Sequence, residues 1–340
     1  FFVAAFEREC TETFWEGHVR AFEFFEKIPR RITYDNTSIA VSMIVGSRER
    51  RLTRGFLELQ SHYLFDHHFC RVARGNEKGV VEGLVKYARL NFMVPVPRVR
   101  DFEELNAHLA ESCRNDLRRR LRGKTQPKAQ LLVEDQAAML PPPPVPFEAA
   151  RTVDTGASSL SLVRFDRNDY SVPVRCAHRQ VVVKGFAWEV VIHCEGREVA
   201  RHRRIWDKEK VLFEPVHYLA LLERKPGALD HALPLDRWEL PECFGILRRR
   251  LEAKDEGEGT REYIRVLRLL EKHSLKALRQ AVEKALEHGA TTRDAVALFL
   301  YPGEEQRNQS FNLDGHPHLK RVIVQAPNLR VYAQLLGGTR

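Results

Sequence analysis

Apolar side chains along residues 1–29 follow two different periods. Phe1–Phe6 is almost wholly apolar, which predicts a buried strand. Residues 11–27 then place their apolar side chains on one face, and this period predicts an amphipathic helix. Thr11 is suited to cap the helix, and Pro29 stops it because proline has no backbone N–H to donate. We therefore expect a strand followed by a helix.

The same pattern continues beyond Pro29. Short apolar runs at Arg31–Tyr34 and at 69–72 predict two strands, and residues 39–45 form a further apolar run. Between these runs, apolar side chains at helical spacing over 52–63 predict a second helix. Strands that alternate with helices are typical of an α/β layer structure.

The helix predicted after Gly79 has two distinct faces. At about 100° per residue, its apolar side chains share one arc, which predicts a buried face made of Val80, Val81, Leu84, Val85, Ala88 and Phe92. The opposite arc is polar and holds Lys78, Glu82, Lys86 and Arg89. Glu82 is therefore predicted to lie at the surface, in a basic strip.

A long helix and a proline-rich linker come next. Residues 101–122 carry inward apolar side chains at helical spacing. The last turns of this predicted helix hold an arginine cluster, Arg118, Arg119, Arg120 and Arg122. The prolines at 141–146 predict a stiff, extended spacer rather than packed structure.

The hydrophobic period changes to two between residues 160 and 204. Apolar side chains alternate from Tyr170 to Ile192, which predicts several short strands, and Glu195–Gly196 predicts a hairpin turn. We interpret this region as a small β-barrel. Its predicted exposed positions are rich in basic residues: Arg164, Arg167, Arg175, Arg179, Lys184, Arg197, Arg201, Arg203 and Arg204.

From Asp236 the period is helical again, and the apolar positions predict four helices that end near Tyr301. Gly289 is placed to stop the third helix, and Thr292 can cap the fourth. The pattern then fades, so residues 303–340 are predicted to be weakly ordered.

The composition favours a nucleic-acid partner. The 340 residues carry 55 Lys and Arg against 46 Asp and Glu, a net charge of +9, and this excess suits a polyanion.

The six cysteines are widely spaced, which predicts reduced thiols in a cytoplasmic protein instead of a zinc site. The sequence has no glycine-rich nucleotide-binding loop, and no apolar run approaches the ~20 residues of a membrane span.

Two acids stand out by their placement in the α/β region. Asp35 ends a predicted strand within Tyr34-Asp-Asn36, and Glu82 lies on the next predicted helix but one, within Lys78-Gly-Val-Val-Glu-Gly83. Taken singly, the first is an ordinary turn acid and the second a solvated surface charge. Together they place two carboxylates where a divalent metal ion could lie between them.

These strings resemble those of transposases and integrases with a ribonuclease-H-like core and a catalytic Asp-Asp-Glu triad. Asn76–Pro95, with Ala21–Phe25 upstream of Pro29-Arg-Arg31, is similar to the IstA transposases of the insertion-sequence-21 family. The resemblance covers nearly the whole chain, including the linker at Leu140–Pro146. It implies a multidomain α/β plus β fold, ordered as a ribonuclease-H-like core with missing first strands (1–98), a helix and linker (99–150), a small β-barrel (151–206), a helical region (207–302) and a weakly ordered tail (303–340).

The resemblance also assigns roles to the two acids. Asp35 corresponds to the second catalytic acid and Glu82 to the third, and both would bind Mg²⁺, with Mn²⁺ as a substitute, in a site for two ions. Asn36 either orients Asp35 or is only a turn amide. The family's first Asp and its helix-turn-helix region would lie before Phe1, so we expect a fragment that does not cleave DNA by itself.

The implied function is DNA transposition, in which a donor strand is hydrolysed and the freed 3′-hydroxyl attacks target DNA. The implied partners are duplex DNA, further copies of the chain and an AAA+ ATPase helper that would contact the helical region. The residues predicted to contact DNA are Lys78, Lys86, Arg89, Arg118, Arg119, Arg120, Arg122, Arg201, Arg203 and Arg204. Two alternatives stay open: a catalytically dead DNA-binding and assembly remnant, and a nuclease of the same fold that cuts without joining.

Overall fold

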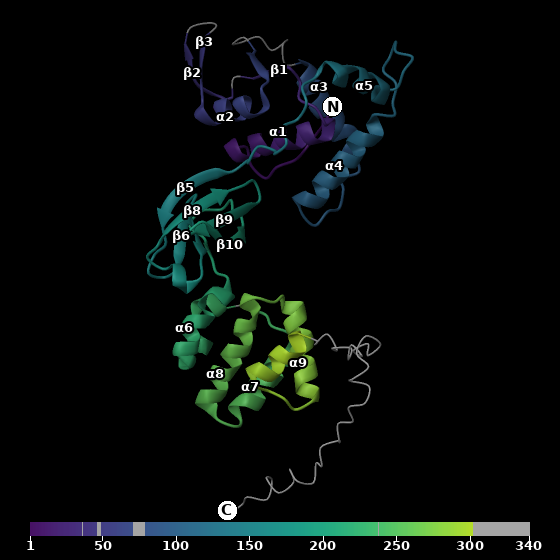
Figure 1. The fold of residues 1–340 in the computed structure, drawn as a ribbon. Coiled ribbons are helices and arrows are strands. Elements are labelled where there is room, and N and C mark those ends of the chain that lie inside the picture. The colour runs from purple at the N-terminus through teal and green to yellow at the C-terminus, as the bar shows by residue number, and fades with distance from the viewer. Residues whose placement is uncertain (36, 46–48, 71–78, 237, 302–340) are drawn as a thin grey trace, which may run out of the picture. The chain divides into compact units, whose positions relative to one another are not determined.

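The computed structural model describes residues 1–35, 37–45, 49–70, 79–236 and 238–301. The chain forms two compact units, Phe1–Trp238 and Glu239–Arg340, and Figure 1 shows their helices and strands. Among the helices of the described part, none has the length and apolar character needed to cross a membrane.

The first part of the chain is built around helix α1 (Thr11–Phe25) and two parallel strands, β1 (Arg31–Tyr34) and β4 (Asp66–Phe69). Helix α2 (Arg54–Tyr63) completes a shared hydrophobic core. Aromatic side chains dominate this core, which includes Trp15, Phe22, Tyr34, Phe56, Tyr63 and Phe65. From α1 to β4, helices therefore alternate with strands, as predicted for this stretch.

Strands β2 (Val41–Val45) and β3 (Glu49–Leu52) form a separate antiparallel pair. Thr53 caps α2, since its side chain accepts a hydrogen bond from the backbone N–H of Phe56 at 3.2 Å. Farther along the chain, the strand predicted at 69–72 begins earlier than expected, because β4 starts at Asp66.

The strand predicted at Phe1–Phe6 is wrong. This segment has no regular structure, and its side chains are half-buried. The Asn106 side chain replaces a neighbouring strand, because it accepts from Ala5 N at 2.7 Å and donates to Ala5 O at 2.9 Å. The cap of α1 is also one residue earlier than predicted: Cys10 takes that position, and its N–H donates to Thr13 Oγ1 at 3.0 Å.

Three helices follow the α/β part: α3 (Gly79–Phe92), α4 (Phe102–Asp116) and α5 (Lys128–Ala138). The buried face predicted for α3 is confirmed at Ala88, which is 3% exposed, but is wrong at Val81 and Val85, which are 62% and 44% exposed. Helix α4 ends at Asp116, so the arginine cluster lies in turns after the helix and not on its last turns.

The proline-rich segment forms neither helix nor strand, and its residues 141–146 are exposed except for the half-buried Pro143, in keeping with the predicted spacer, but the residues at both of its ends are packed. Leu140 and Ile28 exchange backbone hydrogen bonds at 2.9 and 2.8 Å. Phe147 packs edge-on against Trp15, with ring centroids 5.5 Å apart, and its N–H donates to the Tyr63 hydroxyl at 3.1 Å. These contacts fix the segment onto the core of α1 and α2 at both ends.

Seven strands after this segment form two sheets around one core, and we call residues 151–212 the β domain. The larger sheet, in the order β10-β9-β8-β5, contains β5 (Arg151–Gly156), β8 (Gln180–Gly185), β9 (Glu189–Cys194) and β10 (Arg197–Arg203). The smaller sheet, in the order β11-β7-β6, contains β6 (Leu162–Phe165), β7 (Asn168–Ser171) and β11 (Val211–Leu212).

The predicted barrel is not closed. Residues 151–212 are all described, and within them the two sheets remain separate. The sheets share a core that includes Val163, Phe165, Tyr170, Val183 and Ile192. They approach closely at Gly185, where an added Cβ would lie 2.1 Å from Phe165 Cζ. The predicted hairpin turn is confirmed, because Glu195 and Gly196 both have positive φ between β9 and β10.

Helix α6 (Leu219–Arg224) lies near the end of the first unit. The second unit contains the four predicted helices: α7 (Glu242–Glu252), α8 (Glu256–Leu267), α9 (Leu275–Glu287) and α10 (Arg293–Leu300). Gly289 has φ +66 just beyond α9, and Thr292 caps α10 by accepting from Ala295 N at 3.3 Å, as predicted. The tail predicted at 303–340 lies outside the described residues.

Candidate functional site

Asp35 is exposed at the carboxyl end of β1. Strand β1 runs parallel to β4, with Tyr34 opposite Phe69, and the N–H of Cys70 donates to Tyr34 O at 2.9 Å. Both strands therefore end at the same edge of this small sheet. The carboxyl edge of a parallel sheet is where ligands commonly bind in α/β proteins, so Asp35 occupies a position suited to binding.

A buried hydrogen-bond chain holds the residue before Asp35. The Tyr34 hydroxyl lies 2.9 Å from His18 Nε2, and His18 Nδ1 lies 2.7 Å from the Phe14 carbonyl oxygen. Burial lowers the pKa of His18, which keeps its ring neutral, and raises the pKa of Tyr34 above its usual range. A neutral ring must donate from Nδ1 to the carbonyl, so Nε2 accepts from the tyrosine. Helix α1 thus anchors the end of β1.

Glu82 lies in the first turn of α3 and is exposed, as predicted. Lys86 and Arg89 follow it by four and seven residues, and both are exposed as well. The amino-terminal end of a helix carries partial positive charge, which stabilises a carboxylate there. Helix α3 is the first described element after β4, so the chain passes from the edge that bears Asp35 to the turn that bears Glu82.

Asn36 and Lys78, the remaining predicted residues near these acids, lie outside the described residues. Within the described ranges, no group of three or more His, Cys, Asp or Glu side chains could hold a metal ion. The metal ligands that the sequence predicts here are two acids, Asp35 and Glu82.

The arginine cluster after α4 is exposed at Arg118, Arg119, Arg120 and Arg122. Arg119 also pairs with the buried Asp116 at 3.2 Å, and its guanidinium lies over the Tyr87 ring at 5.1 Å. In the β domain, Arg203 is exposed. Arg201 is exposed too and pairs with Glu189 and Glu198, whose carboxylates raise its pKa. The predicted exposure of these arginines is therefore confirmed, while their contact with DNA stays a prediction.

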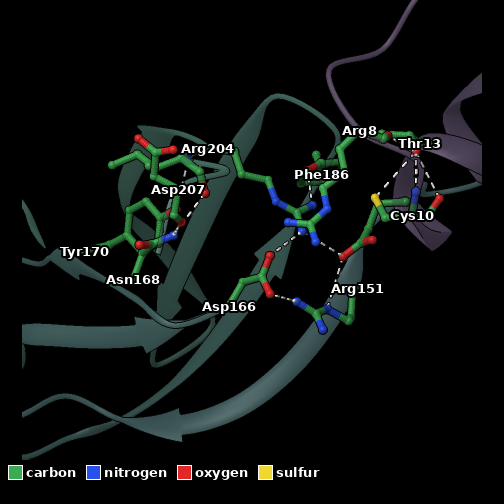
Figure 2. A network of polar contacts seen from close by, with 12 residues as sticks. Arg8, Cys10, Thr13, Arg151, Asp166, Asn168, Tyr170, Phe186, Arg204 and Asp207 are labelled. Carbon is green, nitrogen blue, oxygen red and sulfur yellow. Dashed lines mark hydrogen bonds and ion pairs between the residues drawn. The ribbon is translucent and has the colours of Figure 1, made fainter. Parts of the chain in front are cut away.

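Arg204 is not exposed, which corrects the prediction for this residue. Its side chain is 1% exposed and pairs with Glu12 and Asp166, both at 3.2 Å. Its Nη1 also donates to the Phe186 carbonyl oxygen at 2.7 Å, as Figure 2 shows. The alternation along β10 could have indicated this burial. Ala200 and His202 are buried, and Arg204 follows at the same spacing of two residues, which places it on the same inward face. Nothing in the sequence marked Glu12 as its partner.

Known transposases are similar to this chain over most of its length. Residues 142–214 match the family model described as Mu transposase, C-terminal domain. A transposase of Aminobacter aminovorans is 34% identical over 307 residues, which are 88% of this chain and 59% of that protein. The transposase for insertion sequences IS1326/IS1353 of Pseudomonas aeruginosa is 32% identical over 308 residues, with the same two shares.

The transposase for insertion sequence element IS21 of Pseudomonas aeruginosa is 29% identical over 241 residues, which are 70% of this chain and 61% of that protein. The chain belongs to the insertion-sequence-21 family of transposases. The resemblance inferred from the sequence is therefore confirmed. This transposase chain spans 59% of the length of the first relatives given above, and its matched C-terminal domain covers the proline-rich segment and the β domain.

Proposed function

We propose that this chain carries out part of DNA transposition, as the portion of a transposase that holds two catalytic carboxylates and binds DNA. The observation that supports it most is the placement of Asp35. This exposed acid stands at the carboxyl edge of β1 and β4, and the next described helix presents Glu82 in its first turn. The arrangement occurs in a chain that is similar to transposases along most of its length.

The two carboxylates suit a hard divalent cation. Exposed carboxylate oxygens are the ligands that Mg²⁺ prefers, and Mn²⁺ can substitute for it. Asp35 and Glu82 would hold two such ions together with the family's first Asp, which the resemblance does not assign to this sequence. When bound, two ions activate the attacking oxygen and stabilise the leaving oxygen of a phosphoryl transfer. Asn36 is proposed to orient Asp35.

The proposed reaction has two in-line steps at a ribonuclease-H-like core. Water first attacks a phosphorus at the end of the element, and the P–O bond to the 3′ oxygen breaks. The freed 3′-hydroxyl then attacks a phosphorus of target DNA, and a P–O bond of the target breaks. Asp35 and Glu82 would contribute by holding the cations close to both reacting oxygens, where negative charge develops.

The proposed DNA path consists of exposed basic residues. Beside Glu82 it begins with Lys86 and Arg89, which are exposed and would bind phosphates near the cleaved bond. The rest of the path is Arg118, Arg119, Arg120, Arg122, Arg201 and Arg203, with Lys78 proposed from the sequence alone. Homo-oligomer formation and binding of an AAA+ ATPase are proposed for the helical second unit.

Iron-directed cleavage of the polypeptide tests the carboxylate pair without any need for DNA cleavage. Fe²⁺ replaces Mg²⁺ at oxygen-rich sites, and with ascorbate and peroxide it cuts the backbone near its ligands. We expect cuts close to residues 35 and 82 that Mg²⁺ suppresses and that Asp35→Asn and Glu82→Gln abolish. Asp66→Asn is the matched control, because Asp66 is also exposed but stands at the opposite end of β4. Cuts that persist in Asp35→Asn would refute the site.

Binding to duplex DNA at increasing salt tests the DNA path. Each neutralised phosphate contributes about −0.9 to the slope of log affinity against log salt concentration. Fluorescence anisotropy with a labelled duplex should therefore show a steep slope, which becomes shallower by about 0.9 in Arg120→Met if this arginine neutralises one phosphate. Affinity that stays constant between low and physiological salt would exclude the proposed path.

Two rival functions make different predictions. A catalytically dead remnant would bind DNA but show no iron-directed cuts at residues 35 and 82. A nuclease of the same fold would show the cuts, yet when joined to the rest of a relative's length it would hydrolyse strands without joining them. A strand-transfer assay on that completed protein separates the nuclease from the transposase.

A further inference from the structure

Four charged side chains gather where helix α1 meets the β domain. Glu12 comes from α1, Arg151 from β5 and Asp166 from the turn between β6 and β7, while Arg204 directly follows β10. Arg204 contacts both carboxylates at 3.2 Å, and Arg151 contacts Glu12 at 3.1 Å and Asp166 at 3.7 Å. Figure 2 shows Arg151, Asp166 and Arg204 of this cluster. The two acids and two arginines balance in charge.

Burial makes the central pair depend on each other. The side chains of Glu12 and Arg204 are 4% and 1% exposed. A charge removed from water is tolerated only beside a partner of opposite sign. Each member therefore fixes the position of the other, although they lie 192 residues apart in sequence.

Aromatic rings close off the same contact. The Arg204 guanidinium lies over the Trp206 ring at 3.9 Å. Close by, Trp188 of the β domain stacks on Phe6, with ring centroids 5.1 Å apart. The Arg20 guanidinium of α1 lies over the Trp188 ring, 4.2 Å from its centroid. The β domain is thus held on α1 by two neighbouring contacts, which opposes rotation as well as separation.

The same helix also reaches the proposed catalytic edge. His18 of α1 accepts the hydrogen bond from Tyr34, the residue before Asp35. Helix α1 therefore connects the charged cluster at its first turn to the end of β1 about one and two-thirds turns later. A displacement of the β domain along α1 would change its distance from Asp35.

We propose that Arg204 is a positioning residue: paired with Glu12, it clamps the β domain onto α1, so that the domain's basic surface and the Asp35–Glu82 pair meet one duplex in a fixed register. This inference rests on the proposed function. It gives Arg204 a role that requires burial, in place of the direct phosphate contact predicted from the sequence. Arg151 supports the clamp from the domain's edge.

Glu12→Gln gives the sharpest test because two explanations predict opposite signs. The change removes one negative charge, so electrostatic attraction alone would tighten binding of the +9 chain to DNA. Release of the β domain would instead lower the effective concentration of its basic surface beside the rest of the path, and we expect affinity to fall about 10-fold. Binding that is equal to or tighter than that of the wild-type chain would overturn the proposal.

Arg204→Met separates positioning from direct contact. A residue that binds phosphate contributes about −0.9 to the salt slope, whereas a clamp changes affinity and leaves the number of neutralised phosphates unchanged. We expect Arg204→Met to weaken binding with an unchanged slope. A slope that becomes shallower by about 0.9 would make Arg204 a direct contact and refute the clamp.

A matched control and a measurement without DNA complete the test. Arg164→Met removes an exposed arginine of β6 that pairs with Asp169 and Glu209 inside the β domain. Hydrogen exchange in the first turn of α1 should become faster in Glu12→Gln and Arg204→Met, and stay unchanged in Arg164→Met. Equal exchange in all three variants would refute the clamp. If the wild-type chain fails to bind DNA, the proposed function fails, while exchange still decides the clamp.

Discussion

Two buried histidines, His202 of the β domain and His217 of the turn that follows it, make stability depend on pH. His202 and His217 lie with ring centroids 5.7 Å apart, and the Ser171 hydroxyl lies 2.9 Å from His217 Nδ1. Burial lowers the pKa of His217 to about 3, with smaller contributions from His202 and Arg175. Burial lowers the pKa of His202 as well. Both rings are therefore neutral in the folded protein at neutral pH.

The sign of the effect follows from linkage. Above pH ~6.5 His217 is neutral in both the folded and the unfolded state, so it adds no pH dependence. Below pH ~6.5, His217 binds a proton in the unfolded chain but not in the folded one. Stability therefore decreases as the pH is lowered from about 6.5 to about 3. The loss from His217 is about 2 kcal/mol at pH 5 relative to pH 7. Glu214, whose pKa burial raises, acts in the opposite direction.

Urea unfolding at pH 7 and pH 5 checks this prediction. The wild-type chain should lose stability between the two values, and His217→Asn should lose markedly less because the main titrating ring is gone. His178→Asn is the control, since His178 is exposed in the β domain, against which His217 packs through Ser171. An equal loss in His217→Asn and the wild-type chain would contradict the assignment.

At the scale of elements, the two sheets of the β domain depend on close approach at Gly185. A Cβ at this position would meet three atoms of the Phe165 ring at 2.1–3.1 Å. The ring belongs to β6 and is 3% exposed, so it has little room to move. The separation between the sheets is therefore set by a glycine on one and an aromatic ring on the other.

Gly185→Ala should destabilise the β domain by about 1–3 kcal/mol, the usual range for overpacking a well-filled core. Gly156→Ala is a matched control, because Gly156 also ends a strand of the same sheet and its added Cβ would meet only Gln180 Nε2, at 3.9 Å. Chemical denaturation followed by tryptophan fluorescence measures both. Equal stability of the two variants would show that Phe165 moves aside easily.

Local patterns predicted most elements, since a strand or helix leaves its period in the sequence. The four helices of the second unit and the hairpin at Glu195–Gly196 needed no knowledge of distant residues. The errors arose where a partner distant in sequence decides the structure. Asn106 satisfies Ala5 in place of a strand, and Glu12 makes the burial of Arg204 possible. Helix α5, in the predicted linker, was missed because its apolar positions form no clear face.

For the candidate site, the sequence placed Asp35 at a strand end and Glu82 on a helix surface, and both placements are confirmed. Their roles as metal ligands stay a prediction. The His18–Tyr34 hydrogen bond that supports the strand end was not foreseen, because residues 16 apart on two different elements carry no shared period. Buried polar pairs of this kind become visible only with the fold.

At the scale of the whole molecule, the boundary after Trp238 predicts which functions can be separated. A chain that ends at Trp238 keeps the carboxylate pair, the arginine cluster and the β domain. We expect it to bind duplex DNA with the same salt slope as residues 1–340 and to lose self-association, measured by analytical ultracentrifugation. A shortened chain that assembles like the longer one would place the assembly surface elsewhere.

The 340-residue chain by itself is expected to be inactive in Mg²⁺-dependent cleavage of 3′ ends, because the proposed site has two of three carboxylates. Loss of one ligand from a two-ion site removes most of the charge stabilisation on which phosphoryl transfer depends. Incubation of the purified chain with end-labelled duplex and Mg²⁺ measures this. Specific nicking would show that Asp35 and Glu82 suffice or that another acid completes the site.

The proline-rich segment between Leu140 and Phe147 has a consequence for how the chain tolerates change in length. It is fastened at one end by the hydrogen bonds to Ile28 and at the other by the packing of Phe147 on Trp15. Because both ends are held, an added or deleted residue must be accommodated within the six residues between Leu140 and Phe147 or displace one of the two end contacts. Insertions, tags and grafted segments should therefore be placed outside Leu140–Phe147, even though a run of prolines is usually read as a linker that tolerates changes in length.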